Sequence, residues 1–261
     1  MDIFKIATTD DGLSNDEIAA ALAQSLEGRA FPHGKALIIP PDFTRYHSNA
    51  GFITCAYWKL LAARGVQVDV MPALGTHVPV SAEQWKVMFP DIPYGKMIVH
   101  GWRTDVVKLG DVPAEVVAEI TDGLWKEPVA VEVNRRIMDE TYDLIISPGQ
   151  VVPHEVIGMA NHAKNLFVGV GGSDMINKSH MIGAVCGMEK AMGRDHTGGR
   201  EFGRVEVHDA LPDAVFHIVD VLPLRKLHRL GEAIPTLPRT WARLRTSSTA
   251  RRTGASRSPT A

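Results

Sequence analysis

The sequence predicts an α/β protein with a doubly wound, mostly parallel sheet and helices on both faces. Two observations support this fold class. Short apolar runs that end in proline, glycine or polar loops alternate with amphipathic stretches, and 45% of the 261 residues are hydrophobic, which is enough for a substantial core. Strands that alternate with helices along a chain pack as a parallel sheet with the helices on its faces.

The first half of the chain shows this alternation most clearly. Ser14 and Glu17 form a predicted capping box at the start of a helix that Gly28 ends, and Ser81 and Gln84 stand in the same register before a later helix. The predicted elements are a helix over 13–28, a strand over 35–42, a helix over 50–65, a strand running into a loop over 66–77, and a helix over 81–89.

The second half continues the pattern with longer apolar runs. The predicted elements are a strand over 95–102, a helix over 128–140, and strands over 142–150, 165–172 and 215–222. In an open parallel sheet, ligands bind at the carboxyl ends of the strands. The loops "PPDFTRYHS", "ALGTHVPVS" and "SPGQVVPHE" follow three of the predicted strands, and each carries ionisable residues. We therefore expect a functional site at this edge.

The charge of the chain is divided unevenly. The net charge is -2, but residues 225–261 carry nine Lys or Arg against the single acid Glu232, so residues 1–224 carry -10. We interpret residues 1–224 as one α/β catalytic domain and residues 225–261 as a basic, low-complexity tail. High charge and low hydrophobicity predict that the tail is disordered. Binding of nucleic acid by the tail is the weaker interpretation, because no aromatic residues or fold motif accompany the charge.

Several classes of protein are disfavoured by what the sequence lacks. Cys55 and Cys186 are far apart and show no metal-ligand or disulfide spacing. No apolar run is long enough to span a membrane, and the first residues do not resemble a signal peptide, so we expect a cytoplasmic protein without membrane or nucleic-acid partners. The glycines of "GVGGSD" do not complete a dinucleotide fingerprint. They could hold a phosphate by backbone amides or form a tight turn with positive φ, and the residues alone do not decide between the two.

Histidines in the strand-end loops give the most specific functional signal. His77, His154 and His180 lie in or beside these loops, where imidazole suits proton transfer or metal binding. Each alone is explained by a structural role, but with Asp42 and Lys164 in converging loops they indicate a site. His47 and His162 remain undecided, and His208 and His217 are interpreted as structural.

Arginine in the first of these loops indicates the substrate class. Arg45 follows "PDFT" at a strand exit, where a guanidinium can bind a carboxylate through two hydrogen bonds. Pairing with Asp42 to hold the loop is the structural alternative. A small carboxylic acid is the substrate class that these residues suggest.

These motifs together resemble the N-terminal catalytic domain of the lactate racemase family. The resemblance rests on "DFTR", "GTH", and "PH" followed ten residues later by Lys164 and a further sixteen residues later by His180, and it covers residues 3–224. Members of this family are nickel-dependent 2-hydroxyacid racemases and epimerases that use a nickel-pincer nucleotide, a pyridinium thioamide/thiocarboxylate mononucleotide. The resemblance implies the same isomerase activity here, on a lactate-like acid or a sugar acid, and it implies cofactor-synthesis enzymes as partners.

The resemblance also implies roles for individual residues. Lys164 matches the lysine that holds the cofactor covalently, and His180 matches the histidine that binds nickel. His77 and His154 match the paired acid/base histidines, and Arg45 matches the arginine that binds the substrate carboxylate. Asp42, in a supporting role, and Thr44 belong to the loop expected at the cofactor.

The sequence departs from the family in two respects. The segment "GMANHAK" replaces a glycine-rich run before Lys164, which favours an acid other than lactate. Family members are also longer, and the C-terminal domain that closes their cleft is apparently missing. Two alternatives to the racemase remain. One is a non-catalytic, cofactor-binding remnant of the same family. The other, which needs no family resemblance, is a divalent-metal hydrolase.

Overall fold

The structure is a computed structural model that describes residues 3, 5–7, 12–161, 164–193 and 215–220. All of these belong to a unit that spans Met1–Pro223. The predicted disordered tail, 225–261, lies outside the described residues, as do His162 and His208. The division of the chain into a catalytic domain and a tail thus stays a prediction.

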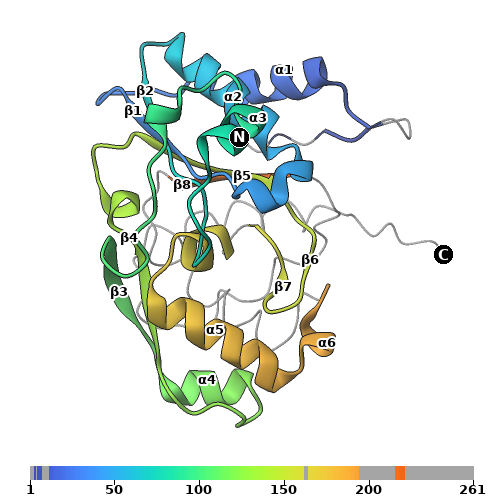
Figure 1. The fold of residues 1–261 in the computed structure, drawn as a ribbon, viewed down its shortest axis with the longest axis vertical. Coiled ribbons are helices and arrows are strands. Elements are labelled where there is room, and N and C mark those ends of the chain that lie inside the picture. Colours follow the sequence, from blue (N-terminus) through green and yellow to red (C-terminus); the bar gives the residue numbers. More distant parts are fainter. Residues whose placement is uncertain (1–2, 4, 8–11, 162–163, 194–214, 221–261) are drawn as a thin grey trace, which may run out of the picture. The chain divides into compact units, whose positions relative to one another are not determined.

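A four-stranded parallel sheet forms the centre of the described unit (Figure 1). Its strands, in the spatial order β2-β1-β5-β8, are β2 (Gln67–Val70), β1 (Lys35–Ile38), β5 (Leu144–Gln150) and β8 (Val215–Asp220). Each of them lies within or overlaps a strand predicted from the sequence. The parallel α/β fold is therefore confirmed.

Helices and a second, smaller sheet cover opposite faces of this parallel sheet. Ala36 and Ile38 of β1 pack into a buried cluster with residues of α1 (Asn15–Ser25) and α2 (Ala50–Ala62). Leu37, which points to the other face, packs into a cluster that includes residues of β3, β4, α4 and α5. These four elements are β3 (Val106–Val112), β4 (Val129–Asn134), α4 (Ala114–Ile120) and α5 (Ser173–Cys186).

The shorter elements lie mainly in the connections between strands. They are α3 (Ala82–Met88), α6 (Met188–Ala191), the paired β6 (Pro153–His154) and β7 (Gly158–Met159), the 3₁₀ turns η1 (Phe43–Ser48), η2 (Tyr94–Lys96) and η3 (Arg135–Met138), and the π-helical turn η4 (Lys164–Gly169). Both predicted capping boxes are present, at Ser14 with Glu17 and at Ser81 with Gln84. None of the described helices is both long and apolar enough to cross a bilayer.

The helix predicted over 128–140 is wrong. Val129–Asn134 forms strand β4 and pairs antiparallel with β3, and η3 follows it. Valines at 129, 131 and 133 are buried while the intervening residues are less so, which is the two-residue period of a strand. The sequence prediction overlooked this period, and it also missed β3, α4, α5 and α6.

The strand predicted over 95–102 is also wrong. The segment begins in η2 and then makes a single parallel bridge between Met97 and Val70 of β2. The backbone N–H of Ile98 donates to the carbonyl of Val70, but no continuous ladder follows. A short apolar run predicts burial at the sheet edge without specifying strand geometry.

The predicted strand over 165–172 is replaced by the turn η4 and the residues after it. The N–H of Val170 donates to the carbonyl of Asn165, five residues back, as a π-helix requires. Residues Asn165 to Gly169 are all buried, so the sequence shows no alternation of buried and exposed positions that would have indicated a helical turn. The glycines here do not have positive φ. A Cβ on Gly171 would lie 1.6 Å from the carbonyl oxygen of Phe167, so close packing explains this glycine.

Replacement of Gly171 by alanine tests this packing. We expect Gly171→Ala to lower the free energy of unfolding by at least about 1–3 kcal/mol, because the added Cβ would collide with the backbone carbonyl of Phe167, which cannot rotate away as a side chain could. Gly95→Ala is the matched control, since a Cβ there meets nothing within 4 Å. Urea unfolding measures both variants, and equal stability of the two would contradict the described packing.

Candidate functional site

Three loops at the carboxyl edge of the parallel sheet carry the predicted site residues. The loop after β1 carries Asp42, Thr44 and Arg45 in or next to η1, the loop after β2 carries His77, and the chain after β5 carries His154 and Lys164. Because β1, β2 and β5 are parallel neighbours, the three loops leave the sheet at the same edge. The fold thus gathers residues that are up to 122 positions apart in the sequence.

Asp42 organises the first loop. It is buried and caps η1, with its Oδ1 accepting hydrogen bonds from the backbone N–H of Thr44 at 3.2 Å and from the Thr44 hydroxyl at 2.5 Å. No ion pair joins Asp42 to Arg45, although both residues are described. The structural alternative, in which Arg45 holds the loop through Asp42, is therefore not what the structure shows.

The second carboxylate oxygen of Asp42 binds His77. Nδ1 of His77 lies 2.5 Å from Oδ2 of Asp42. An ionised carboxylate only accepts, so Nδ1 of His77 donates the hydrogen and the neutral ring keeps its lone pair on Nε2. The same loop is docked on η4, because the N–H of Gly75 donates to the carbonyl of Gly169 at 2.7 Å. His77 is thus an oriented base with an accessible side chain, 58% exposed.

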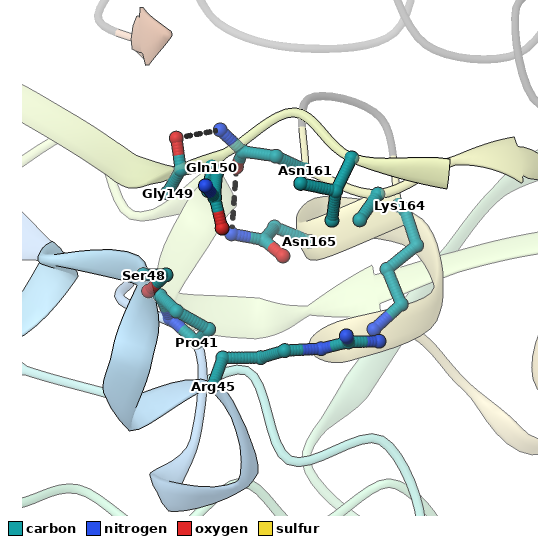
Figure 2. Close-up of a pocket in the computed structure, with 10 residues that line it drawn as sticks. Pro41, Arg45, Ser48, Gly149, Gln150, Asn161, Lys164 and Asn165 are labelled. Carbon is teal, nitrogen blue, oxygen red and sulfur yellow. Dashed lines mark hydrogen bonds between the residues drawn. The ribbon is translucent and has the colours of Figure 1, made fainter. Parts of the chain in front are cut away.

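Lys164 begins η4 and lies beside Arg45. Figure 2 shows the Arg45 side chain extended so that its guanidinium approaches the Lys164 amine. Burial lowers the pKa of Lys164, and the positive charge of Arg45 lowers it further. The carboxylates of Asp42 and Glu155 oppose this shift. Two partly buried cationic groups therefore lie side by side, which attracts an anion and makes the Lys164 amine easier to deprotonate.

The ring of His154 accepts a hydrogen bond at Nδ1, whereas the ring of His77 donates one there. Nδ1 of His154 accepts the backbone N–H of Val156 at 3.2 Å, so the neutral ring carries its hydrogen on Nε2. Burial lowers the pKa of His154 to about 4, and the charge of Lys164 acts in the same direction. Glu155 opposes the shift, whereas Arg45 and His180 add to it. At neutral pH His154 is thus an uncharged hydrogen-bond donor.

His180 lies on α5 with one nitrogen engaged by its own helix. Its Nδ1 lies 2.6 Å from the carbonyl oxygen of Ile176 and donates to it, which leaves Nε2 with a lone pair. A histidine that donates one N–H to a backbone carbonyl has the tautomer and orientation of a metal ligand. His180 is exposed on its helix and close enough to His154 to affect its titration.

A pocket opens between the Arg45 loop and the chain around Lys164 (Figure 2). The cavity is small, with a volume of about 20 Å³, and it is partly open to solvent. Amides tie one wall to β5: Asn161 donates to the carbonyl of Gly149 at 2.8 Å, and Asn165 donates to the side-chain oxygen of Asn161 at 2.9 Å. Asn161 has φ of 64°, a left-handed conformation that asparagine tolerates better than most residues. Asn161 of the departing stretch "GMANHAK" and the neighbouring Asn165 thus form a polar wall next to Lys164.

A metal site made by the protein alone has no ligand set in the described part of the chain. No three His, Cys, Asp or Glu side chains there converge on one point. The divalent-metal hydrolase therefore gains no support from the described residues. A single histidine such as His180 would need ligands supplied by another group.

The structure gathers the predicted residues and adds others that the sequence did not reveal. Asp42 contacts Thr44 and His77, and electrostatic effects link Asp42, Arg45, His154, Lys164 and His180. His47 is exposed on η1 and has no established role. Glu155, Asn161 and Asn165 were missed. All three lie within the stretch "EVIGMANHAKN", where polar residues next to His154 and Lys164 were the available signal.

The fold is α/β, and its converging loops place ionisable side chains and a pocket at the carboxyl edge of the parallel sheet. Residues 11–193 match the lactate racemase N-terminal domain family, and the chain belongs to this family. A comparison with curated proteins finds no match.

Two solved structures are similar to this chain. A protein from Thermotoga maritima matches with a TM-score of 0.70 and 21% identity, over 79% of this chain and 51% of that chain, and this likeness shows the fold. The lactate racemase apoprotein from Thermoanaerobacterium thermosaccharolyticum matches with a TM-score of 0.46 and 15% identity, over 67% of this chain and 45% of that chain. The chain thus spans about half the length of both proteins.

The charges around Lys164 predict opposite effects of two substitutions on its pKa. Arg45→Gln removes a neighbouring cation and should raise the pKa of Lys164, whereas Asp42→Asn removes a neighbouring anion and should lower it. Asparagine retains the capping oxygen for Thr44, so the loop should keep its fold. The measurement is the pH titration of ¹³C-dimethylated lysines by NMR, with the Lys164 signal assigned by its loss in Lys164→Arg.

A control separates local from general charge effects. Arg103→Gln removes a cation that stacks on Trp102 and is not among the groups that shift Lys164. It should leave the Lys164 titration unchanged. A shift of the same sign in Arg45→Gln and Asp42→Asn would contradict the described arrangement.

Proposed function

We propose that the protein is a 2-hydroxyacid racemase or epimerase that inverts C2 of its substrate with a nickel-pincer nucleotide. The observation that carries this proposal is the pair of histidines in opposite hydrogen-bonding states beside two partly buried cations, Arg45 and Lys164. His77 presents a lone pair on Nε2, and His154 presents a hydrogen on Nε2. Inversion of a hydroxyacid needs one group that takes the hydroxyl proton and another that returns a proton on the opposite side.

The residues present fit the cofactor that family membership suggests. The lowered pKa of Lys164 increases the fraction of neutral amine, which is the form that makes a covalent link. His180 has a free Nε2 for nickel, and the nucleotide would supply the other ligands that the described protein residues do not. When bound, the group supplies reversible acceptance of the C2 hydrogen as hydride, chemistry that no side chain provides.

Arg45 is the residue that we assign to the substrate carboxylate. Its guanidinium can make two parallel hydrogen bonds to a carboxylate, and the Lys164 link would remove the neighbouring ammonium charge and leave Arg45 as the main cation. The substrate hydroxyl would then face Nε2 of His77. Asp42 keeps this ring in the required tautomer and stabilises the imidazolium that forms.

The polar pocket wall supports a hydroxyl-rich substrate over lactate. Ser48, Gln150 and Asn165 line the pocket together with Arg45 and Lys164. Hydroxyl and amide groups bind substrate hydroxyls by hydrogen bonds, and a site built for them discriminates against acids that lack them. A sugar acid therefore fits this wall better than a three-carbon acid. Cofactor-synthesis enzymes are the partners that this function requires.

Binding of the cofactor without turnover is the alternative function. The chain spans about half the length of the two similar structures, so activity of the whole enzyme is a separate question from cofactor retention. The two functions give different results in one experiment, in which retention and racemisation are measured on the same cofactor-loaded protein.

Substitution of either histidine tests the proposed reaction. His77→Asn and His154→Asn should each lower kcat for racemisation by about 10²–10⁴-fold while the cofactor stays bound, because each removes an acid/base group. The assay follows loss of optical activity over a panel of lactate-like and sugar acids, with protein co-produced with the cofactor-making enzymes.

His33→Asn is the matched control. His33 also binds a carboxylate through Nδ1, at 2.7 Å from Asp143, but it precedes β1 at the opposite end of the strand. It should retain wild-type kcat. Racemisation that survives in His77→Asn or His154→Asn would refute the two-histidine mechanism, and bound cofactor with no racemisation in the wild type would favour the alternative.

A further inference from the structure

Glu155 is a charged residue at the site that the proposed function leaves without a role. Its Oε2 lies 3.8 Å from Nδ1 of His154, and its side chain is 59% exposed. A hydrogen bond from its own backbone N–H lowers the pKa of Glu155, burial opposes this shift, and the charges of His154, Arg45 and Lys164 lower the pKa further. The carboxylate therefore remains charged and within reach of the His154 ring.

The present hydrogen bond of His154 allows only half of an acid/base cycle. Because Nδ1 accepts the N–H of Val156, the neutral ring has its hydrogen on Nε2. In this tautomer Nε2 can donate a hydrogen bond but cannot accept a proton from a substrate hydroxyl. His77 has no such restriction, because its Nδ1 hydrogen is already held by Asp42.

A working cycle at Nε2 needs a hydrogen that stays on Nδ1. The doubly protonated ring gives the Nε2 proton to the substrate oxygen and becomes neutral with its hydrogen on Nδ1, and Nε2 can then take a proton from the next hydroxyl. Throughout this cycle the Nδ1 hydrogen needs an acceptor, which the N–H of Val156 is not.

The groups that face the ring from each neighbouring element identify that acceptor. They are Lys164 of η4, Arg45 of η1, His180 of α5 and Glu155 of the β6–β7 connection. The first three disfavour a positive ring, and Glu155 alone among them favours it. Glu155 is also the only carboxylate that forms an ion pair with His154 among the described residues.

We propose that Glu155 is a positioning residue that accepts the Nδ1 hydrogen of His154 whenever this ring works as acid or base. The proposal rests on the proposed function and deepens it. It gives the site two histidine–carboxylate pairs. The pair of His77 with Asp42 is already formed, and its carboxylate is buried. The pair of His154 with Glu155 forms when the His154 ring turns away from the Val156 N–H and gains a proton.

The pairing itself can be measured without the cofactor. In protein with ¹⁵N-labelled histidine, long-range ¹H–¹⁵N spectra report which ring nitrogen carries hydrogen, and loss of one signal set in His154→Gln assigns the ring among the eleven histidines. We expect the Nε2–H tautomer at neutral pH. We also expect the pKa of His154 to fall further in Glu155→Gln and to stay nearer to that of the wild type in Glu155→Asp, which keeps the charge.

Glu119→Gln is the matched control for this titration. Glu119 is an exposed carboxylate on α4 and is not among the groups that shift His154. It should leave the His154 titration unchanged. An Nδ1–H tautomer in the wild type, or equal titration of His154 in Glu155→Gln and Glu119→Gln, would overturn the pairing whatever the activity.

Turnover of the loaded protein tests the role of the pairing. Glu155→Gln should lower kcat on the order of ten-fold while KM changes by less than about two-fold, because Glu155 acts through His154 and does not touch the substrate. The activity should recover partly in Glu155→Asp. Unchanged kcat in Glu155→Gln with an altered His154 titration would overturn the catalytic role. A wild type that holds cofactor without turnover would instead refute the proposed function, and the NMR result would still decide the pairing.

Discussion

The site depends on the enclosure of the Lys164 amine beside the Arg45 guanidinium. Burial and a neighbouring cation both disfavour the ammonium, so the surrounding structure has to hold these two residues together. It does so through η4, whose Gly169 packs against Ala73 and accepts the N–H of Gly75 in the loop after β2, and through the amide of Asn161 that fastens the preceding segment to β5. The docking of the loop after β2 on η4 also positions His77, whereas His154 is placed by the pairing of β6 with β7.

Much of the fold and of the candidate site could be predicted from the sequence. The strands β1, β2, β5 and β8 were evident as short apolar runs, and two helix starts were evident as capping boxes at Ser14 and Ser81. The site residues could be proposed because polar groups at strand exits of a parallel sheet converge. Family membership, shown by the match over residues 11–193, agrees with the resemblance carried by "DFTR", "GTH" and the spacing of Lys164.

The remainder depends on contacts that local sequence does not encode. Residues 165–169 of η4 are buried, so this run looked like a strand. The glycine at 171 is required because the carbonyl of Phe167 leaves no room for a Cβ, and its own φ does not require glycine. β4 was assigned to a helix although its valines alternate. The tautomers of His77 and His154 follow from Asp42 and from the Val156 N–H, and the role proposed for Glu155 follows from the second of these, which appears only in the folded chain.

Intact-protein mass spectrometry with nickel analysis tests the central claim most directly, on protein co-produced with the cofactor-making enzymes. The account predicts a mass increase that peptide mapping assigns to Lys164, accompanied by near-stoichiometric nickel that is lost in Lys164→Ala. An unmodified, nickel-free wild-type chain under the same conditions would contradict it.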